Sequence, residues 1–324
     1  MPTPARLLIT GATGNVGGEA LRILRGQQPA GTTLVVASRD PERDRARLAL
    51  SAADRVEVVP FDFTKPETVA PVLRGVTGLL LMRPPALSDV AIYLKPVVEA
   101  ASAAGVGHVV FLSLQGAQHN PFVPHHKVEG YLQASRMRFS FLRPSFFMQN
   151  LSSTLRDDIR ERDQLMLPAG HARTSFVDAL DVGAVAAQLL RTPPTASDAY
   201  ELTSHEALTY DEIAARLTEV LGRPIRYHAA GIWEFRAYER AKGTPAALVN
   251  VMTGIYLAAR FGLAEHVSPV LGELLGRAPG TLRAFLERER ACWLPEVGWK
   301  PEVNRAPPLL SPRQPASGPP TGAS

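Results

Sequence analysis

Short apolar runs alternate with helical patterns through the first half of the chain. The apolar runs predict six strands, at residues 6–9, 33–37, 56–59, 78–82, 108–112 and 138–142. Strands that are apolar on both faces are typical of a parallel sheet covered by helices on both sides. The alternation therefore predicts an α/β fold built on a doubly wound parallel sheet, the Rossmann arrangement.

Helices are expected between these strands. After the second strand, Asp40 stands as an N-cap, with Pro41 and Glu42 in the first turn of a helix that reaches about residue 52. Further helices are expected at 65–74, at 88–104 with Ser88 as the cap, and at 124–135. Because ligands of such sheets lie across the carboxyl ends of the strands, the residues after each strand are the candidates for function.

The regular alternation ends near residue 150. Beyond it we expect helices at 151–162, 181–190 and 209–221, strands at 175–178, 200–203 and 224–227, and mainly helices from 232 to 290. These patterns predict a Rossmann domain at 1–150, to whose sheet later strands from 151–230 return, and a smaller, mainly helical substrate region at 151–304. Residues 305–324 are rich in Pro, Ser and Gly, which predicts a disordered tail.

Composition narrows the class of protein. The 324 residues are enough to bury a core, and the single cysteine, Cys292, excludes a disulfide framework and a cysteine-rich metal site. Lys and Arg (35) exceed Asp and Glu (31) by only 4, which gives little support to nucleic-acid binding. The chain shows no secretion-signal pattern and no apolar run long enough to span a membrane, so we expect a cytoplasmic protein without a membrane partner.

Residues 10–18, Thr-Gly-Ala-Thr-Gly-Asn-Val-Gly-Gly, connect the first strand to the first helix. Such a turn directs free backbone N–H groups and the positive end of the helix dipole at one point, which suits a phosphate. The first glycine permits the tight turn, the second lets a pyrophosphate approach, and the third lets the helix lie close to its strand. The candidate cofactor-binding residues here are Gly11, Thr13, Gly14, Asn15, Val16 and Gly17.

Residues after the second and third strands bear on the kind of cofactor. NAD-binding proteins usually place an acid after the second strand, whereas NADP-binding proteins supply a cation there. Arg39 has this place and can pair with a 2′-phosphate, while Asp40 is interpreted as a helix cap. We therefore expect NADP(H), with NAD(H) as the alternative. Asp62 and Phe63 are candidates for the adenine, although an Asp that only forms a turn has the same pattern.

Two further strand ends carry candidates for chemistry. Arg83, before two prolines, is a candidate contact for phosphate or substrate, or a charge exposed to solvent. Short-chain dehydrogenases place a Tyr-x-x-x-Lys pair after the fifth strand, in which the lysine lowers the pKa of the proton-donating tyrosine. Lys127 fits the second place of this pair, but Val123 stands where the tyrosine would be.

The chain resembles the NmrA-like atypical short-chain dehydrogenase/reductases. The resemblance rests on the glycine turn, on residues 125–129 (HHKVE), 141–150 (FLRPSFFMQN) and 175–182 (SFVDALDV), and it extends to about residue 286. The family includes NAD(P)H:quinone oxidoreductases, azo-dye reductases and cofactor-sensing regulators. It implies that Lys127 binds the nicotinamide ribose, that Pro144 and Phe146 line the nicotinamide, and that Ser113 lies at the reacting end.

The missing tyrosine bears on the substrate. Hydride transfer needs little from the protein beyond positioning and the exclusion of water. A quinone or azo acceptor takes its proton from solvent or a modest donor, whereas a plain ketone needs a placed acid. The remaining donor candidates are His126, Lys127 and Tyr131; we favour Lys127 as the catalytic residue, with binding of the ribose alone as an equal alternative.

Other kinds of site receive less support. His119, His125 and His126 share one loop without a carboxylate at ligand spacing, so we expect no metal site. The absence of a G-x-S-x-G elbow disfavours a serine hydrolase. Five aromatic residues form either an apolar substrate pocket or part of the core: Phe146, Phe147, Trp233, Phe235 and Tyr238.

Two functions from different classes remain open. One is an NAD(P)H-dependent oxidoreductase that transfers hydride to a quinone-like or other conjugated acceptor, and the other is a non-catalytic NADP(H) sensor that signals to a protein partner. A complete nicotinamide pocket around Lys127 and Pro144 favours the enzyme, whereas Val123 favours the sensor. We favour the enzyme, with a small aromatic or quinone-like substrate and a homodimer as one assembly that the prediction allows.

Overall fold

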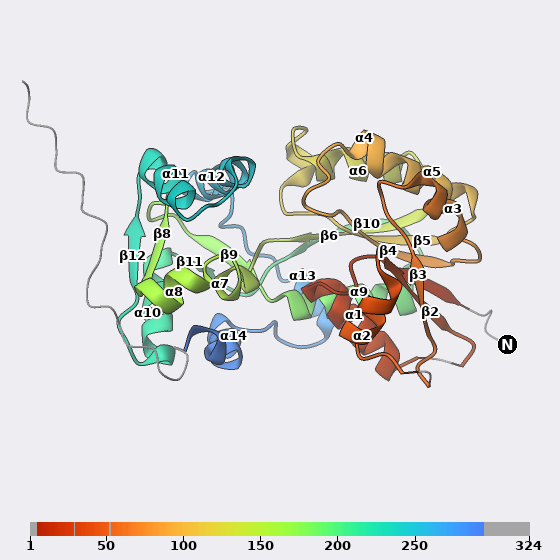
Figure 1. Cartoon of the computed structure of the whole chain (residues 1–324), viewed down its shortest axis with the longest axis horizontal. Helices are drawn as coiled ribbons and strands as arrows, with labels where there is room; N and C mark the ends of the chain where they lie inside the picture. Colours follow the sequence, from red (N-terminus) through yellow and green to blue (C-terminus); the bar gives the residue numbers. More distant parts are fainter. Residues whose placement is uncertain (1–4, 29, 52, 295–324) are drawn as a thin grey trace, which may run out of the picture.

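Two lobes make up the described part of the chain (Figure 1). This computed structural model describes residues 5–28, 30–51 and 53–294. The first lobe holds the large sheet, and the second lobe is built mainly from residues after 145. The tail predicted at 305–324 lies outside the described residues, and no helix within the described ranges is long and apolar enough to cross a bilayer.

Seven parallel strands form the central sheet, in the order β10-β6-β5-β4-β1-β2-β3. The strands are β1 (Arg6–Ile9), β2 (Thr33–Ser38), β3 (Val56–Pro60), β4 (Gly78–Met82), β5 (His108–Leu112), β6 (Arg138–Pro144) and β10 (Asp198–Leu202). The strand order reverses between β1 and β4, the place where open α/β sheets bind their ligands. The predicted doubly wound sheet is confirmed, and each of the six predicted strands lies within two residues of its expected bounds.

Side-chain alternation divides the core between the two faces of the sheet. In β1, Leu7 and Ile9 belong to one apolar cluster, whereas Leu8 belongs to another. The first cluster is covered by α1 (Asn15–Gly26) and α9 (Ala179–Arg191), which pack against each other. The second is covered by α3 (Val69–Val72), α5 (Lys95–Ala103) and α6 (Pro124–Gln133), which lie on the other side of the sheet in Figure 1.

Helix α2 (Pro41–Arg47) begins where the sequence predicts. The Asp40 carboxylate accepts from the Arg43 N–H at 3.2 Å, which confirms Asp40 as a helix cap. The helix ends well before the expected residue 52, because Ala49 takes the left-handed conformation with φ 48°. Helix α6 likewise ends at Gln133, two residues before its predicted end.

Prolines shorten two other predicted helices. The segment at 65–74 is a 3₁₀ turn, η1 (Pro66–Thr68), followed by the single turn of α3. The segment at 88–104 is divided into α4 (Val90–Tyr93) and α5, because Pro96 has no N–H to continue the ladder. The cap of α4 is Asp89 and not the expected Ser88, since the Asp89 carboxylate accepts from the N–H groups of the next turn.

The second lobe surrounds an apolar cluster of its own, which includes Phe176, Tyr210, Phe285 and Trp293. Its strands form two small sheets, β11 (Ala207–Leu208), β9 (Thr174–Val177) and β7 (Phe146–Phe147), and β12 (Arg226–Ala229) with β8 (Gln164–Leu167). Its helices are α7 (Gln149–Ser152), α8 (Arg156–Arg162), α10 (Tyr210–Leu221), α11 (Ile232–Ala241), α12 (Ala246–Arg260) and α14 (Leu282–Glu289).

Two features of the second half bear on the predicted division of the chain. The helix predicted at 151–162 is divided into α7 and α8, where the Ser153 hydroxyl donates to the Gln149 carbonyl and competes with the helix ladder. In addition, α9, β10 and α13 (Val270–Leu275) pack in the first lobe, so the chain returns to the large sheet after it has entered the second lobe.

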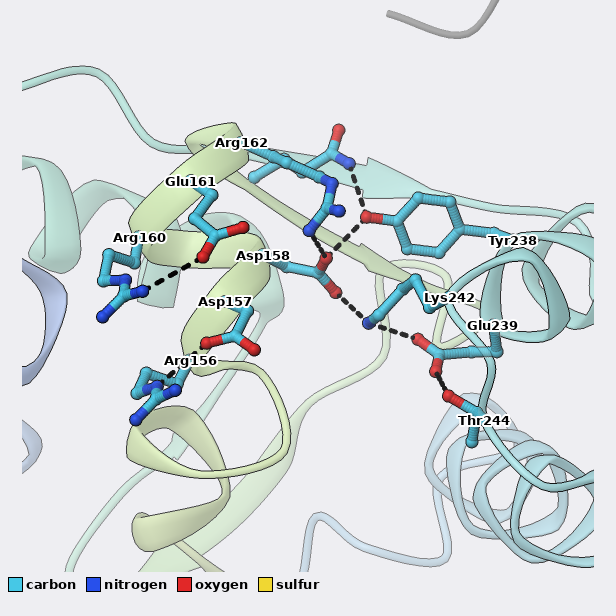
Figure 2. A network of polar contacts seen from close by, with 11 residues as sticks. Arg156, Asp157, Asp158, Arg160, Glu161, Arg162, Tyr238, Glu239, Lys242 and Thr244 are labelled. Atoms are coloured by element: carbon cyan, nitrogen blue, oxygen red, sulfur yellow. Dashed lines mark hydrogen bonds and ion pairs between the residues drawn. The ribbon is translucent and has the colours of Figure 1, made fainter. Parts of the chain in front are cut away.

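A buried carboxylate ties α8 to α11 (Figure 2). Asp158 is 1% exposed and accepts from the Tyr238 hydroxyl at 2.5 Å, from Lys242 Nζ at 2.8 Å and from Arg162 Nη1 at 3.3 Å. Lys242 also donates to Glu239, which is buried as well. Lys242 and Arg162 therefore offset the cost in free energy of burying the carboxylates of Asp158 and Glu239. Burial and the bond to Asp158 raise the pKa of Tyr238, so the phenol stays protonated.

His108 makes the free energy of unfolding depend on pH. Its ring is 1% exposed at the start of β5, and Nε2 lies 3.0 Å from the Ser140 hydroxyl. Burial, together with the nearby charge of Arg138, lowers the pKa of His108 to about 4. Because this value lies below the pKa of about 6.5 in an unfolded chain, the unfolded state binds the proton first as the pH falls.

As the pH falls from about 6.5 to about 4, His108 takes up its proton only in the unfolded state. We predict that this lowers the free energy of unfolding by up to about 1.4 kcal/mol for each pH unit. His108→Gln keeps a polar partner for Ser140 but does not titrate, so its urea midpoint should fall less steeply with pH than that of the wild type. His119→Gln, at an exposed position, is the matched control. Parallel midpoint curves for wild type and His108→Gln would contradict the prediction.

Candidate functional site

The glycine turn after β1 has no room for side chains. Gly11 has φ +62°, in the left-handed region that favours glycine. A Cβ on Gly17 would lie 2.5 Å from the Gly11 carbonyl oxygen and 2.6 Å from Met82 Cε. Gly14 is exposed and extended, and its N–H donates to the Gly11 carbonyl at 3.0 Å. The tight turn and the close approach of the helix are therefore both present.

The N-terminus of α1 is suited to an anion. No side chain caps this end, and its first turn has no acidic residue. The first N–H groups of a helix have no partner inside it, and the helix dipole adds partial positive charge there. Val16 packs in the core and offers only its backbone, whereas Thr13 is half-buried and Asn15 is exposed. This end of α1 is therefore suited to the predicted pyrophosphate, whose binding by these residues stays a prediction.

Arg39 is an exposed cation directly after β2. It is exposed and makes no hydrogen bond or ion pair with any described residue. The polar groups around it are engaged, because Asp40 caps α2 and the Ser38 hydroxyl donates to the Asp44 carboxylate at 2.5 Å. Arg43 lies 3.8 Å and 3.6 Å from the carboxylates of Asp40 and Asp44. Arg39 thus keeps the free guanidinium that binding of a 2′-phosphate requires.

Asp62 and Phe63 follow β3. Asp62 Oδ1 accepts from the Thr64 N–H at 2.9 Å and from the Thr64 hydroxyl at 2.8 Å. The bond from the backbone is the main cause that lowers the pKa of Asp62, and the charge of Arg39 adds to it. Phe63 is half-buried and packs edge to face on Phe61, with ring centroids 4.7 Å apart. Asp62 therefore forms a turn, the alternative that the sequence left open, and its contact with adenine stays a prediction.

Arg83 shapes its own loop after β4. Its Nη1 donates to the carbonyl oxygens of Pro84, Pro85 and Leu87 at 3.0 to 3.1 Å. Burial lowers the pKa of Arg83 from its ordinary value. Since Nη1 is used by the loop, contact with phosphate or substrate stays a prediction for the rest of the guanidinium.

Ser113, after β5, belongs to a buried polar cluster whose other members the sequence analysis missed. Its hydroxyl donates to Glu129 Oε1 at 2.6 Å, and the two residues are 4% and 3% exposed. Arg143 donates to the same carboxylate, from Nε to Oε1 at 3.0 Å and from Nη2 to Oε2 at 2.7 Å. Arg143 also lies 3.7 Å from Glu201, which accepts from Gln118 Nε2 at 3.0 Å. The cluster joins α6 to the carboxyl ends of β5, β6 and β10.

One signal in the sequence points to Glu129. It interrupts the apolar face that α6 turns toward the sheet, where Val128 and Leu132 are buried. A carboxylate on such a face needs a cation and hydrogen-bond donors. The sequence pattern does not identify Arg143 as that cation, because the two residues meet only through the packing of α6 on β6.

Lys127 lies in the first turn of α6. Its side chain is exposed and has no hydrogen bond or ion pair with any residue in the described ranges. Val123, where the tyrosine of other short-chain dehydrogenases would stand, is the N-cap residue of this helix. Lys127 therefore keeps a free ammonium group for a ligand, as its predicted roles in catalysis and ribose binding require.

The histidines beside Lys127 are held by the protein. His126 Nδ1 lies 2.9 Å from the Ala117 carbonyl oxygen. Burial, followed by the charge of Arg83, lowers the pKa of His125 to about 4, so this ring is neutral near pH 7. No group of three or more His, Cys, Asp or Glu residues suited to a metal ion occurs in the part of the chain that the structure describes.

Pro144 is the last residue of β6, and Phe146 begins β7 two residues later. The Pro144 carbonyl accepts from the Gln115 N–H at 3.0 Å, which holds the segment after β5 against the end of β6. Phe146 is half-buried and lies edge to face with Phe176, with ring centroids 6.1 Å apart. Pro144 follows Arg143 of the Ser113 cluster in β6, whereas Phe146 belongs to β7 of the small sheet, and the contact of both residues with a nicotinamide stays a prediction.

The aromatic residues proposed as a pocket or as core differ in role. Phe235 is 0% exposed in the core of the second lobe, and Tyr238 belongs to the Asp158 network. Phe147 packs against the apolar cluster of the first lobe. Trp233, by contrast, is 81% exposed. These residues do not form one aromatic pocket.

The segment after α12 supplies an apolar surface that the sequence analysis did not single out. The His266 carbonyl accepts from Gln115 Nε2 at 3.3 Å, so this segment reaches the loop that follows β5. Phe261 and Leu263 on the same segment are 75% and 74% exposed. Two exposed apolar side chains therefore lie within five residues of the point where the second lobe contacts the loop after β5.

Residues 3–257 match the NmrA-like family. The chain is 30% identical over 291 residues to an NAD(P)H azoreductase of Xenophilus azovorans, a match that covers 89% of this chain and 99% of that protein. It is 26% identical over 279 residues to quinone oxidoreductase 2 of Escherichia coli, with coverage of 85% and 96%.

Solved structures share the fold. An NADPH-dependent quinone oxidoreductase of Escherichia coli in complex with NADPH has a TM-score of 0.79 at 26% identity and covers 87% of this chain and 99% of its own. A triphenylmethane reductase of Citrobacter in complex with NADP(H) has a TM-score of 0.77 at 24% identity, with coverage of 88% and 99%, which is a likeness of fold. The resemblance predicted from the sequence is confirmed, and the chain belongs to the NmrA-like family.

Proposed function

We propose that this protein is an NAD(P)H-dependent oxidoreductase, with NADP(H) as the preferred cofactor, that transfers hydride to a quinone-like or other conjugated acceptor. The observation that carries the proposal is the glycine turn after β1, at the place where the strand order of the sheet reverses. The uncapped N-terminus of α1 follows this turn, and the guanidinium of Arg39 follows the neighbouring strand β2. Family membership and the relatives named as azo and quinone reductases support it.

Each end of the cofactor has residues suited to it. The backbone of residues 11–17 would hold the pyrophosphate, and Arg39 would pair with the 2′-phosphate. Lys127 would hold the nicotinamide ribose, and Pro144 and Phe146 would line the nicotinamide. When bound, the cofactor supplies the hydride, while the protein orients the partners and excludes water.

The donor set limits the substrate class. Val123 cannot give a proton, and among the donor candidates His126 already has its Nδ1 2.9 Å from the Ala117 carbonyl oxygen. Lys127 remains as a donor that is exposed and unpaired with any described residue, and it has to share this task with holding the ribose. A small aromatic or quinone-like acceptor suits such a site because it takes its proton from solvent. The exposed Phe261 and Leu263 would supply apolar contact for its ring system.

Assembly and compartment belong to the same proposal. The single cysteine, Cys292, is half-buried, and burial raises its thiol pKa to about 11, so it is an unreactive thiol. A protein without a disulfide framework suits the reducing cytoplasm, where NADPH is available. A homodimer is compatible with this function, and light scattering of the purified protein would decide between one and two copies.

The second candidate function is an NADP(H) sensor without turnover, which Val123 favours. Purified protein mixed with NADPH and 1,4-naphthoquinone distinguishes the two functions. The proposed enzyme consumes the near-ultraviolet absorbance of NADPH at a rate proportional to protein concentration. A sensor binds NADPH, seen by a change in the fluorescence of the reduced nicotinamide, but leaves the absorbance constant with every quinone, azo dye and enone.

Arg39→Ala should weaken NADPH binding by roughly 10- to 100-fold, the effect of losing one charge-assisted bond to a phosphate. Binding of NADH, which has no 2′-phosphate, should change by less than about threefold. Fluorescence titration with both cofactors measures this ratio of affinities. Arg47→Ala, which removes an exposed arginine of α2, is the matched control. An unchanged ratio in Arg39→Ala would remove the basis for NADP(H) preference.

Lys127→Ala should lower kcat for NADPH oxidation by 1,4-naphthoquinone by about 100-fold or more if the lysine donates the proton. If it only holds the ribose, the dissociation constant of NADPH rises and kcat at saturation falls little. Lys95→Ala, on the neighbouring helix α5, is the matched control and should retain wild-type rates. Loss in both lysine variants alike would show that the effect is not specific to Lys127.

A further inference from the structure

The direction of the Ser113 hydroxyl proton is fixed by the cluster around Glu129. The carboxylate of Glu129 accepts from Arg143 at both oxygens, so it is present as an anion that only accepts hydrogen bonds. The short contact of 2.6 Å between Ser113 Oγ and Glu129 Oε1 therefore requires the serine to donate its one proton to the carboxylate. Ser113 directly follows the carboxyl end of β5, and its hydroxyl has no second proton to donate to another group.

Turning this proton toward a substrate would be costly. Glu129 is 3% exposed, and a buried carboxylate that loses one of its donors has no water to replace it. Arg143 is already used by both oxygens of Glu129 and by Glu201, so it has little capacity to compensate. The arrangement is preorganised, because α6, β6 and the position directly after β5 each contribute one residue to it.

We propose that Glu129, held by Arg143, is a positioning residue that keeps the Ser113 proton away from the substrate and thereby restricts the enzyme to delocalised acceptors. This inference rests on the proposed function. Hydride addition to an isolated ketone moves the C=O electron pair onto oxygen, which becomes an alkoxide and needs a donor at once. In a quinone the hydride bonds to one atom, but the negative charge that results is delocalised over the ring and its oxygens, so water can supply the proton. NADPH is oxidised to NADP⁺ in both cases.

The test compares two acceptors in one protein, so that general damage to the site cancels. We measure kcat/KM with NADPH for 1,4-naphthoquinone and for cyclohexanone. Wild type should favour the quinone by at least about 100-fold, the range that one placed donor supplies. In Glu129→Gln the amide has a single acceptor oxygen, for which the charged Arg143 competes better than Ser113. The freed hydroxyl should raise the ketone-to-quinone ratio at least tenfold.

Two further variants keep this result specific. In the double variant Ser113→Ala/Glu129→Gln the gain in the ratio should disappear, which a purely structural role of Glu129 would not produce. Glu57→Gln removes the carboxylate of another bidentate pair, with Arg6, and should leave the ratio at the wild-type value. An unchanged ratio in folded Glu129→Gln, or a gain that survives removal of the Ser113 hydroxyl, would overturn the proposal.

A variant that fails to fold does not end the test. Glu129→Met/Arg143→Met removes both charges of the buried pair, a replacement that proteins often tolerate, while Glu201 keeps Gln118 as a donor. This variant should show the same gain in the ratio. Urea midpoints provide a readout that needs no turnover. Ser113→Ala and Glu129→Gln should each lower the urea midpoint. Because both variants lose the same hydrogen bond, the midpoint of the double variant should be no lower than that of the less stable single variant.

The two readouts separate failure of this inference from failure of the proposed function. If wild type oxidises NADPH with neither acceptor nor any other conjugated compound, the proposed function fails, and the midpoints alone decide whether Ser113 donates to Glu129. If turnover with the quinone is clear but the midpoint effects of Ser113 and Glu129 simply add, the hydrogen bond is absent in solution and this inference fails while the function stands.

Discussion

The close approach of α1 to the end of β1 is the constraint on which the rest of the molecule depends. The helix rests on the Gly11 turn only because Gly17 has no side chain, and the tip of Met82 fills the remaining space. The same requirement recurs where α9 packs against α1 on this face of the sheet. A Cβ on Gly183 of α9 would lie 2.7 Å from the Glu19 Cβ and 2.8 Å from the Val16 carbonyl oxygen. Contact between α1 and α9 thus places residues 179–191 over the sheet and brings β10 to its edge.

This return of the chain explains why the two lobes are joined at several points and not by one linker. The second lobe begins at β7, directly after the strand end that carries Pro144. At the start of α9, Asp178 binds Arg288 in the last turn of α14, and Asp181 binds Arg277, which follows α13. Both carboxylates are buried and both are paired, so the bond from Asp178 to Arg288 connects α9 to the second lobe at little cost of unpaired charge.

Much of the first lobe could be predicted from the sequence because its strands are buried on both faces and read as continuous apolar runs. Helix ends were less predictable, since the backbone conformation of Ala49 and the missing N–H of Pro96 override the general propensity of the flanking residues. In the site, the glycine turn and Arg39 follow from local patterns. The bond between Ser113 and Glu129 could not be predicted, because it joins residues sixteen apart through the packing of a helix on a strand.

The cations at the carboxyl edge of the sheet fall into two groups that differ in burial. Arg143 is mostly buried and Arg83 is half-buried, and they donate to carboxylates and carbonyl groups of the protein itself. Arg39 and Lys127 are exposed and are left without such partners among the described residues. An unpaired cation is tolerated in water but not in a protein interior. The protein therefore uses its buried cations to fix the shape of the site, and the exposed ones are available to a ligand that brings negative charge and hydroxyl groups.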